Sequence, residues 1–177
     1  MRFIVRLVKW LLGLLIVLAA AAYMLPRHTI VERSLEMKAT PERVYPLIAA
    51  PREWNKWSPW YESDPQMRQD FSGAESDTGA RSAWVSAKEG SGNMVFDLTE
   101  PNKFVDLTIN FTDMGSSAKG RFDLEPTPGG TRVRWRMESD AGNSPLQRWF
   151  GFLALDRLVG PYFERGLAKM ARIASGS

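Results

Sequence analysis

The pattern of apolar and polar positions divides the chain into two parts. Residues 10–25 form an unbroken run of uncharged, mostly apolar residues. From residue 28 onward the pattern changes to short apolar–polar alternations separated by glycine, proline and asparagine. Long apolar runs are typical of membrane or signal segments, whereas alternation is typical of strands with one buried face. We therefore expect an N-terminal membrane segment, residues 1–27, followed by one folded domain, residues 28–177.

The N-terminal run predicts a helix that enters a membrane through residues 3–25. Arg2, Arg6 and Lys9 precede the run and Arg27 follows it, so the excess of positive charge should keep the N-terminus in the cytoplasm. A retained signal anchor fits this pattern, and so does a signal peptide cleaved near the alanines at 20–22. We expect a single-pass protein of the inner (cytoplasmic) membrane of a bacterium with a periplasmic domain, or a secreted domain if the segment is cleaved.

The remaining pattern predicts an α+β domain. Residues 29–37 alternate as a strand, and Pro41 and Pro51 each begin a short helix. Residues 66–137 read as six further strands separated by turns, which implies antiparallel hairpins. Pro145, with Ser144 as its N-cap, begins a long C-terminal helix that we expect to be kinked at 160–161. We expect a curved antiparallel sheet of about seven strands wrapped around this helix.

The alternation assigns side chains to the inner face of the sheet. The inner set comprises Met94, Phe96 and Leu98, then Val105, Leu107, Ile109 and Phe111, then Ala118, Gly120, Phe122 and Leu124, and finally Thr131, Val133, Trp135 and Met137. This set contains almost no titratable group. It fits an apolar ligand cavity beneath the helix, and it also fits an ordinary filled core. The residues expected to line a cavity are Trp84, Phe96, Leu107, Ile109, Phe122, Trp135, Met137, Phe150 and Leu153.

Two further clusters have alternative interpretations. Trp54, Trp57 and Trp60 form the rim of the cavity, contact the membrane interface, or fill the gap between the short helices and the sheet. The basic residues on the outer face either meet anionic lipid head groups or form a solvated surface paired with Asp123, Glu125 and Glu138. These basic residues are Lys119, Arg121, Arg132, Arg134 and Arg136.

Composition and charge exclude several classes of chemistry. The net charge is +3, but residues 1–27 hold four basic and no acidic residues, so the remainder carries −1 and lacks the basic footprint of a nucleic-acid-binding domain. The absence of cysteine excludes disulfides, thiolate catalysis and iron–sulfur clusters. The single histidine, His28, lies at the predicted membrane boundary. We expect no catalytic residue, no metal site and no cofactor.

The domain resembles the SRPBCC superfamily of START-like helix-grip proteins, and specifically its polyketide cyclase/dehydrase branch. The residues that carry the resemblance are 39–45, the tryptophan-rich segment 54–60, Gly79 with Trp84, and the segments 122–126, 129–135 and 163–167. The resemblance covers residues 29–173. It implies a deep hydrophobic cavity under the C-terminal helix, in which members of the superfamily bind lipids, sterols, polyketides or other apolar molecules.

Three functions follow as hypotheses. The first is a membrane-tethered protein that binds a hydrophobic small molecule or lipid without catalysis. The second is a cyclase or dehydratase acting on an apolar substrate, which requires a polar or titratable group inside the cavity. The third is an interaction module that contacts a partner protein or lipid head groups. The sequence identifies neither the ligand nor the oligomeric state.

Overall fold

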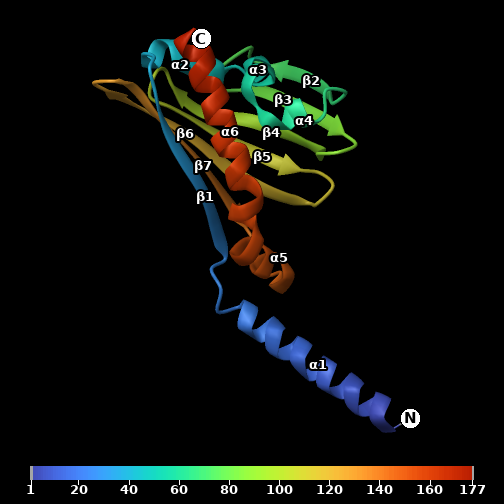
Figure 1. Ribbon diagram of the computed structural model, residues 1–177. Helices are drawn as coiled ribbons and strands as arrows, with labels where there is room; N and C mark the ends of the chain where they lie inside the picture. Colours follow the sequence, from blue (N-terminus) through green and yellow to red (C-terminus); the bar gives the residue numbers. More distant parts are fainter. Residues whose placement is uncertain (1, 177) are drawn as a thin grey trace.

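The computed structural model describes residues 2–176, and its domain consists of a curved sheet around a C-terminal helix (Figure 1). Helix α1 (Arg2–Ala22) projects away from this domain. It is the one helix of the described residues that is long and apolar enough to cross a membrane. The predicted α+β helix-grip architecture is confirmed.

Seven antiparallel strands form the sheet in the order β1-β7-β6-β5-β4-β3-β2. The strands are β1 (His28–Met37), β2 (Arg68–Gly73), β3 (Ala80–Ser86), β4 (Gly90–Glu100), β5 (Phe104–Phe111), β6 (Ser116–Thr127) and β7 (Gly130–Asp140). Strands β2 to β7 are consecutive hairpins, and β1 pairs with β7. The chain therefore brings its first strand beside its last one, and this pairing places the N-terminal segment next to the start of the C-terminal helices.

Short helices between β1 and β2 close one end of the domain. They are α2 (Pro41–Ala49), the 3₁₀ turn η1 (Pro51–Glu53), α3 (Trp54–Trp57) and α4 (Pro59–Ser63). The indole N–H groups of Trp54 and Trp57 donate to the backbone oxygens of Ile48 and Leu47, each at 2.8 Å. These bonds satisfy the polar atoms of two buried rings, so the rings can pack in the interior at little cost.

The C-terminal segment is helical throughout but changes geometry near its start. It comprises α5 (Pro145–Phe150), the π-helical turn η2 (Gly151–Leu155) and α6 (Asp156–Ser175). The Ser144 hydroxyl accepts from the backbone N–H of Gln147 at 3.3 Å, which confirms the predicted N-cap. The interruption of α-helical geometry is at η2, whereas the expected kink site at 160–161 lies inside α6.

The second half of this segment packs most closely on the sheet. Phe163, Leu167 and Met170 are buried, as expected for a helix that covers an apolar sheet. Leu146, Leu153 and Leu158 also belong to the apolar positions of the C-terminal segment in the sequence, and an apolar helix face is expected to be buried, but these three side chains are exposed. The apolar face of the segment therefore exceeds the area that the sheet covers.

The predicted inner faces of β5, β6 and β7 are confirmed, and one assignment on β4 is wrong. Met94 and Phe96 are buried, but Leu98 is 56% exposed. The pairing of β4 with β5 shifts between Phe96 and Leu98, which marks a β-bulge. One extra residue in a strand reverses the sides of all later residues, so Leu98 points outward.

The basic residues of the outer face are interleaved with carboxylates. Arg121 contacts Asp106 and Asp123 at 2.7 Å each, and Arg136 contacts Glu138 at 3.0 Å. The other partners are Asp97 for Lys119, Glu36 for Arg132, and Glu32 and Glu125 for Arg134. This arrangement fits a solvated, internally paired surface better than a basic patch that awaits an anionic partner.

An ionic contact ties α6 to the edge of the sheet. Arg33 on β1 donates to Asp156 at 2.8 Å and to Glu164 at 2.7 Å. The guanidinium passes over Gly160, where an added Cβ would lie 2.1 Å from Nη2 of Arg33. The absence of a side chain at residue 160 thus leaves room for the arginine to reach both carboxylates.

This contact predicts that the effect of Gly160→Ala depends on Arg33. Alanine is favoured over glycine within a helix by about 0.5–1 kcal/mol. In an Arg33→Ala background we expect that gain in the free energy of unfolding, whereas in the natural chain displacement of Arg33 should cancel or reverse it. Urea unfolding of the natural chain, both single variants and the double variant in detergent measures the coupling. Equal effects of G160A in both backgrounds would contradict the arrangement.

Candidate functional site

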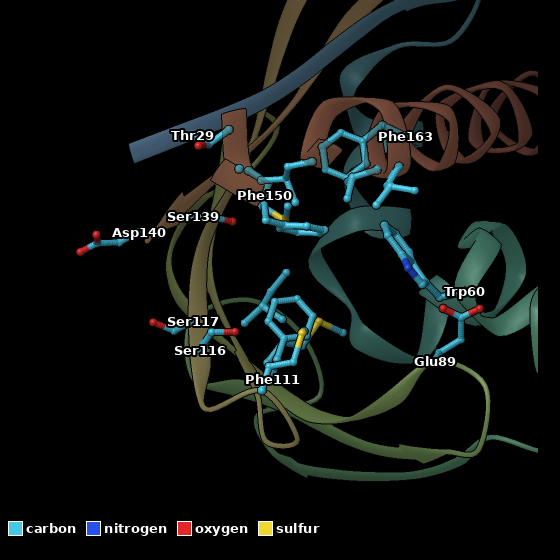
Figure 2. Close-up of a pocket in the computed structure, with 18 of the residues that line it drawn as sticks. Thr29, Trp60, Glu89, Phe111, Ser116, Ser117, Ser139, Asp140, Phe150 and Phe163 are labelled. Atoms are coloured by element: carbon cyan, nitrogen blue, oxygen red, sulfur yellow. The ribbon is translucent and has the colours of Figure 1, made fainter. Parts of the chain in front are cut away.

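An apolar cavity of about 360 Å³ lies between the inner face of the sheet and the C-terminal helices. Figure 2 shows Phe111, Phe150, Phe163 and Trp60 around it, contributed by β5, α5, α6 and α4. Most of its wall consists of aromatic, methionine and aliphatic side chains. Pockets that hold small molecules are typically ~300–1,000 Å³ and mostly apolar, so the space is sufficient for one small hydrophobic ligand.

The rest of the space beneath α6 is filled by an aromatic cluster. Phe163 stacks on Trp135 with ring centroids 3.9 Å apart and planes 5° from parallel. Phe122 stacks on the same indole at 4.8 Å, and Trp57 meets it edge-on at 5.4 Å. Trp54 contacts Phe122 at 5.6 Å. The inner face of the sheet is thus solidly packed toward α2 and hollow toward α5, and residues of α3 and α4 border the hollow part.

The structure divides the sequence-predicted lining residues between these two regions. On the cavity wall are Trp84, Ile109, Trp135, Met137 and Phe150, together with the rim candidates Trp54 and Trp60. Phe96, Leu107, Phe122 and Trp57 are buried in the core and are not part of that wall. Leu153 is exposed on η2 and is also absent from the wall. Ligand contact by the residues on the wall stays a prediction.

Sequence reasoning missed several residues of the wall, of which Tyr61 is chemically the most informative. Tyr61 lies on α4, and burial raises the pKa of its phenol. The phenol is therefore neutral at physiological pH and can act as a hydrogen-bond donor. The signal for Tyr61 in the sequence is its position directly after Trp60, at the end of the tryptophan-rich segment WNKWSPWY.

Two other polar side chains lie on the cavity wall or in the core near α4 and β3. Glu89, on the turn between β3 and β4, belongs to the wall and accepts from the Ser63 hydroxyl. Ser82 is 1% exposed, and its Oγ has no hydrogen-bond partner among the described residues. Among residues 2–176 no group of three His, Cys, Asp or Glu side chains is placed to hold a metal ion. The polar side chains on the wall itself are Thr29, Ser58, Tyr61, Glu89, Ser116, Ser117, Ser139, Asp140 and Gln147.

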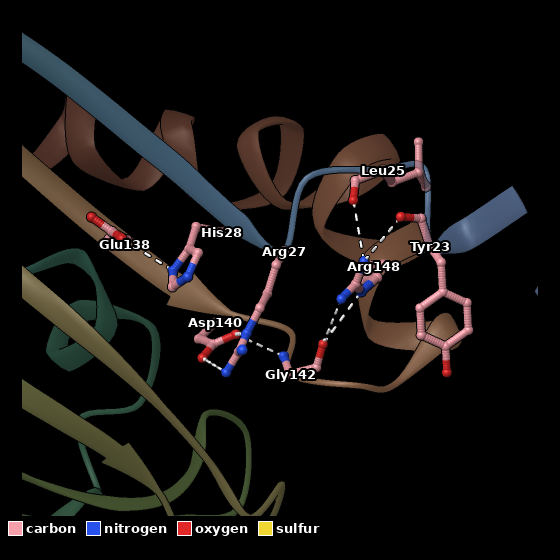
Figure 3. Close-up of polar contacts among 8 residues, drawn as sticks. All are labelled: Tyr23, Leu25, Arg27, His28, Glu138, Asp140, Gly142 and Arg148. Carbon is pink, nitrogen blue, oxygen red and sulfur yellow. Dashed lines mark hydrogen bonds and ion pairs between the residues drawn. The ribbon is translucent and has the colours of Figure 1, made fainter.

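The mouth of the cavity lies beside the N-terminal segment. Asp140 belongs to the wall, although Figure 2 shows its carboxylate pointing away from the interior. Arg27 forms a two-pronged ion pair with that carboxylate, with both N–O distances at 2.7 Å (Figure 3). The Arg27 guanidinium holds the pKa of Asp140 well below its ordinary range. His28 lies next to this pair, 3.1 Å from Glu138.

Arg148 on α5 joins the end of α1 to the domain (Figure 3). Arg148 is 9% exposed, and its guanidinium donates to the backbone oxygens of Gly142, Tyr23 and Leu25 at 3.1–3.4 Å. The charge also lies 5.0 Å from the centre of the Tyr23 ring. Next to it, Trp149 Nε1 donates to the Leu18 oxygen at 3.0 Å. These contacts fix α5, and with it one side of the cavity mouth, against the C-terminal end of α1.

Comparisons with known proteins agree with this architecture. The sequence model of the family described as polyketide cyclase / dehydrase and lipid transport matches residues 28–175. No curated protein sequence matches the chain. Among solved structures, a Staphylococcus aureus protein of unknown function is 14% identical, with a TM-score of 0.65 over 84% of this chain and 94% of its own. A Chromobacterium violaceum protein is 15% identical, with a TM-score of 0.60 over 82% and 97%.

A third similar structure comes from a biosynthetic protein. It is the di-domain ARO/CYC protein StfQ of the steffimycin biosynthetic pathway, 14% identical, with a TM-score of 0.62. The match covers 84% of this chain and 51% of StfQ. At these identities the structural matches establish the fold alone.

The two buried serines of β3 should respond differently to removal of their hydroxyls. Ser86 donates to Asp64 at 2.6 Å and accepts from two backbone N–H groups, so Ser86→Ala should lower the free energy of unfolding by about 1–3 kcal/mol. Ser82 lacks such partners, so Ser82→Ala should leave that free energy unchanged or raise it. Chemical unfolding of both variants measures the difference. A loss in S82A as large as in S86A would show that Ser82 has a partner in solution.

Proposed function

The chain belongs to the polyketide cyclase / dehydrase and lipid transport family, and on that premise we propose that it binds a hydrophobic small molecule or lipid in the cavity beneath its C-terminal helices. The observation that carries this proposal is the apolar cavity of about 360 Å³. A well-packed domain of this size has few voids larger than a water molecule, so a space of this volume requires an explanation. An apolar ligand supplies one.

The size and chemistry of the cavity define the class of ligand. The volume is near the lower end for small-molecule sites, which fits a compact apolar molecule or one chain of a lipid better than an entire phospholipid. Binding would derive mainly from apolar burial, at about 25 cal/mol per Å². The neutral phenol of Tyr61, a residue of the wall, would orient one polar atom of the ligand.

We further propose that α1 is a retained membrane anchor. The apolar run continues past the alanines to Leu25, and the side chains of α1 are exposed along most of its length. Arg2, Arg6 and Lys9 precede the run, which favours a cytoplasmic N-terminus and a domain on the other side of the membrane. In a bacterium with two membranes that side is the periplasm. Cleavage near residues 20–22 would instead release a secreted domain.

A cavity-filling substitution should prevent ligand binding without unfolding the protein. Val159→Trp places an indole in the cavity from α6, whereas Ala168→Trp places it on the exposed side of the same helix. We expect V159W to lose most of the binding of 1-anilinonaphthalene-8-sulfonate, and we expect A168W to bind as the natural chain does. Fluorescence titration of the full chain in detergent measures this. Native mass spectrometry of protein purified from its host identifies any molecule that the natural chain retains.

Two results would contradict the proposal. One is equal dye binding by V159W and A168W, which would locate the dye outside the cavity. The other is the absence of saturable dye binding by the natural chain. Circular dichroism of both variants separates loss of binding from loss of fold.

A cyclase or dehydrase activity is the second candidate, and Tyr61 is the observation that favours it. Catalysis requires a polar or titratable group within the cavity, and a buried phenol can donate a hydrogen bond or a proton to a carbonyl oxygen. If the protein is such an enzyme, Tyr61→Phe should reduce turnover of a poly-β-ketone substrate at least about a hundredfold and leave dye binding intact. Chromatography of the products measures turnover. An unchanged rate in Y61F would remove Tyr61 as the acid.

A further inference from the structure

The mouth of the cavity is surrounded by exposed apolar side chains. Phe150, Leu158 and Met114 belong to the cavity wall and are nevertheless 49%, 55% and 65% exposed. Beyond Met24, ten large apolar side chains of the described residues are exposed, and six of them lie on α5, η2, the first turn of α6 and the β5–β6 loop. These six, which we call the mouth patch, are Met114, Leu146, Phe150, Phe152, Leu153 and Leu158.

The helical part of the mouth patch has the composition of an interfacial helix. Between residues 145 and 155 the only charged side chain is Arg148, and it is turned inward onto backbone oxygens. The backbone of α5 and η2 is helical, so its polar groups are bonded internally. An element of this kind can enter the boundary between head groups and acyl chains without exposing unpaired polar groups there.

Helix α1 holds the mouth patch close to its own C-terminal end. Trp149 donates to Leu18 in the last part of α1, and the Tyr23 hydroxyl donates to the Asn143 oxygen at 3.1 Å. Figure 1 shows α1 leaving the domain at the α5 end, opposite the end where α2–α4 lie. If α1 spans a bilayer, α5 and η2 are therefore at the surface of that bilayer.

We propose that the mouth patch docks into the leaflet from which α1 emerges, so that the cavity opens toward the acyl chains and takes its ligand from the membrane. This inference rests on the proposed function, both on the bound hydrophobic ligand and on the anchor. The occupant of the patch is lipid, because the patch is continuous with α1. A surface held against a membrane-spanning helix meets lipid before it meets any soluble partner.

Site-specific labelling tests the docking directly. The natural chain contains no cysteine, so Phe152→Cys or Leu153→Cys gives a single attachment site for an environment-sensitive fluorophore. Neither residue belongs to the cavity wall. In the full chain reconstituted into phosphatidylcholine vesicles, we expect labels at 152 and 153 to be blue-shifted and quenched by phosphatidylcholine that carries a spin label on its acyl chain.

Val85→Cys provides the matched control. Val85 is exposed like the patch residues, but it lies on β3, distant from α1 (Figure 1). We expect its label to remain in water and unquenched. Labels at 152 and 153 that behave as the one at 85 would overturn the docking. Shielding that depends on protein density and not on the spin-labelled lipid would also overturn it, because a second copy of the chain would then cover the patch.

Uptake kinetics test the consequence for loading. We expect Phe152→Glu with Leu153→Glu to slow the transfer of a pyrene-labelled fatty acid from vesicles about tenfold, because charges oppose insertion of the patch. Binding of 1-anilinonaphthalene-8-sulfonate from water should not change, and Leu98→Glu on the outer face should change neither process. Normal transfer in the double variant would overturn loading through the patch. If the natural chain takes up neither probe, the proposed function fails, while the labels still report on docking.

Discussion

The face-to-face contact between Phe163 and Trp135 determines how the C-terminal helix sits on the sheet. The rings are 3.9 Å apart and nearly parallel, so α6 approaches β7 about as closely as two stacked rings allow. One turn further along α6, Gly166 makes this close approach possible. A Cβ at this position would lie 3.0 Å from the Trp135 ring. With α6 fixed there, Trp54, Trp57 and Phe122 fill the adjoining space. The cavity is the part of the concave surface that this packing does not reach.

The same arrangement explains why the C-terminal segment has excess apolar surface. A helix that is straight and close to the sheet at Phe163 cannot also follow a sheet that curves away from it. The chain changes to π-helical geometry at Gly151–Leu155, and the side chains before that point cover the mouth of the cavity instead of packing against strands. Phe150 and Leu158 consequently have one side toward the cavity and one side exposed. The surplus is thus a result of the sheet's curvature.

Much of the fold could be predicted from the sequence, because strand alternation and turn residues are local. The inner faces of β5, β6 and β7 followed from alternation, and Ser144 was recognisable as an N-cap. The β-bulge before Leu98 left no such trace, since one unpaired residue is not visible in the apolar pattern. Alternation also shows which face is apolar but not how much volume that face encloses. It could not separate Trp135, which reaches the cavity, from Phe122, which lies in the packed core.

The junction between α1 and the domain was beyond sequence reasoning for a different reason. Arg148 makes its contacts with backbone oxygens, and every residue supplies such an atom, so no complementary side chain marks the partner. Oxygens at the end of a helix carry partial negative charge, which attracts a buried guanidinium. The cavity mouth shares its residues with this junction, because Asp140 borders the cavity and holds Arg27. A displacement of α1 relative to the domain would therefore alter the mouth directly, and this links the position of the anchor to access to the cavity.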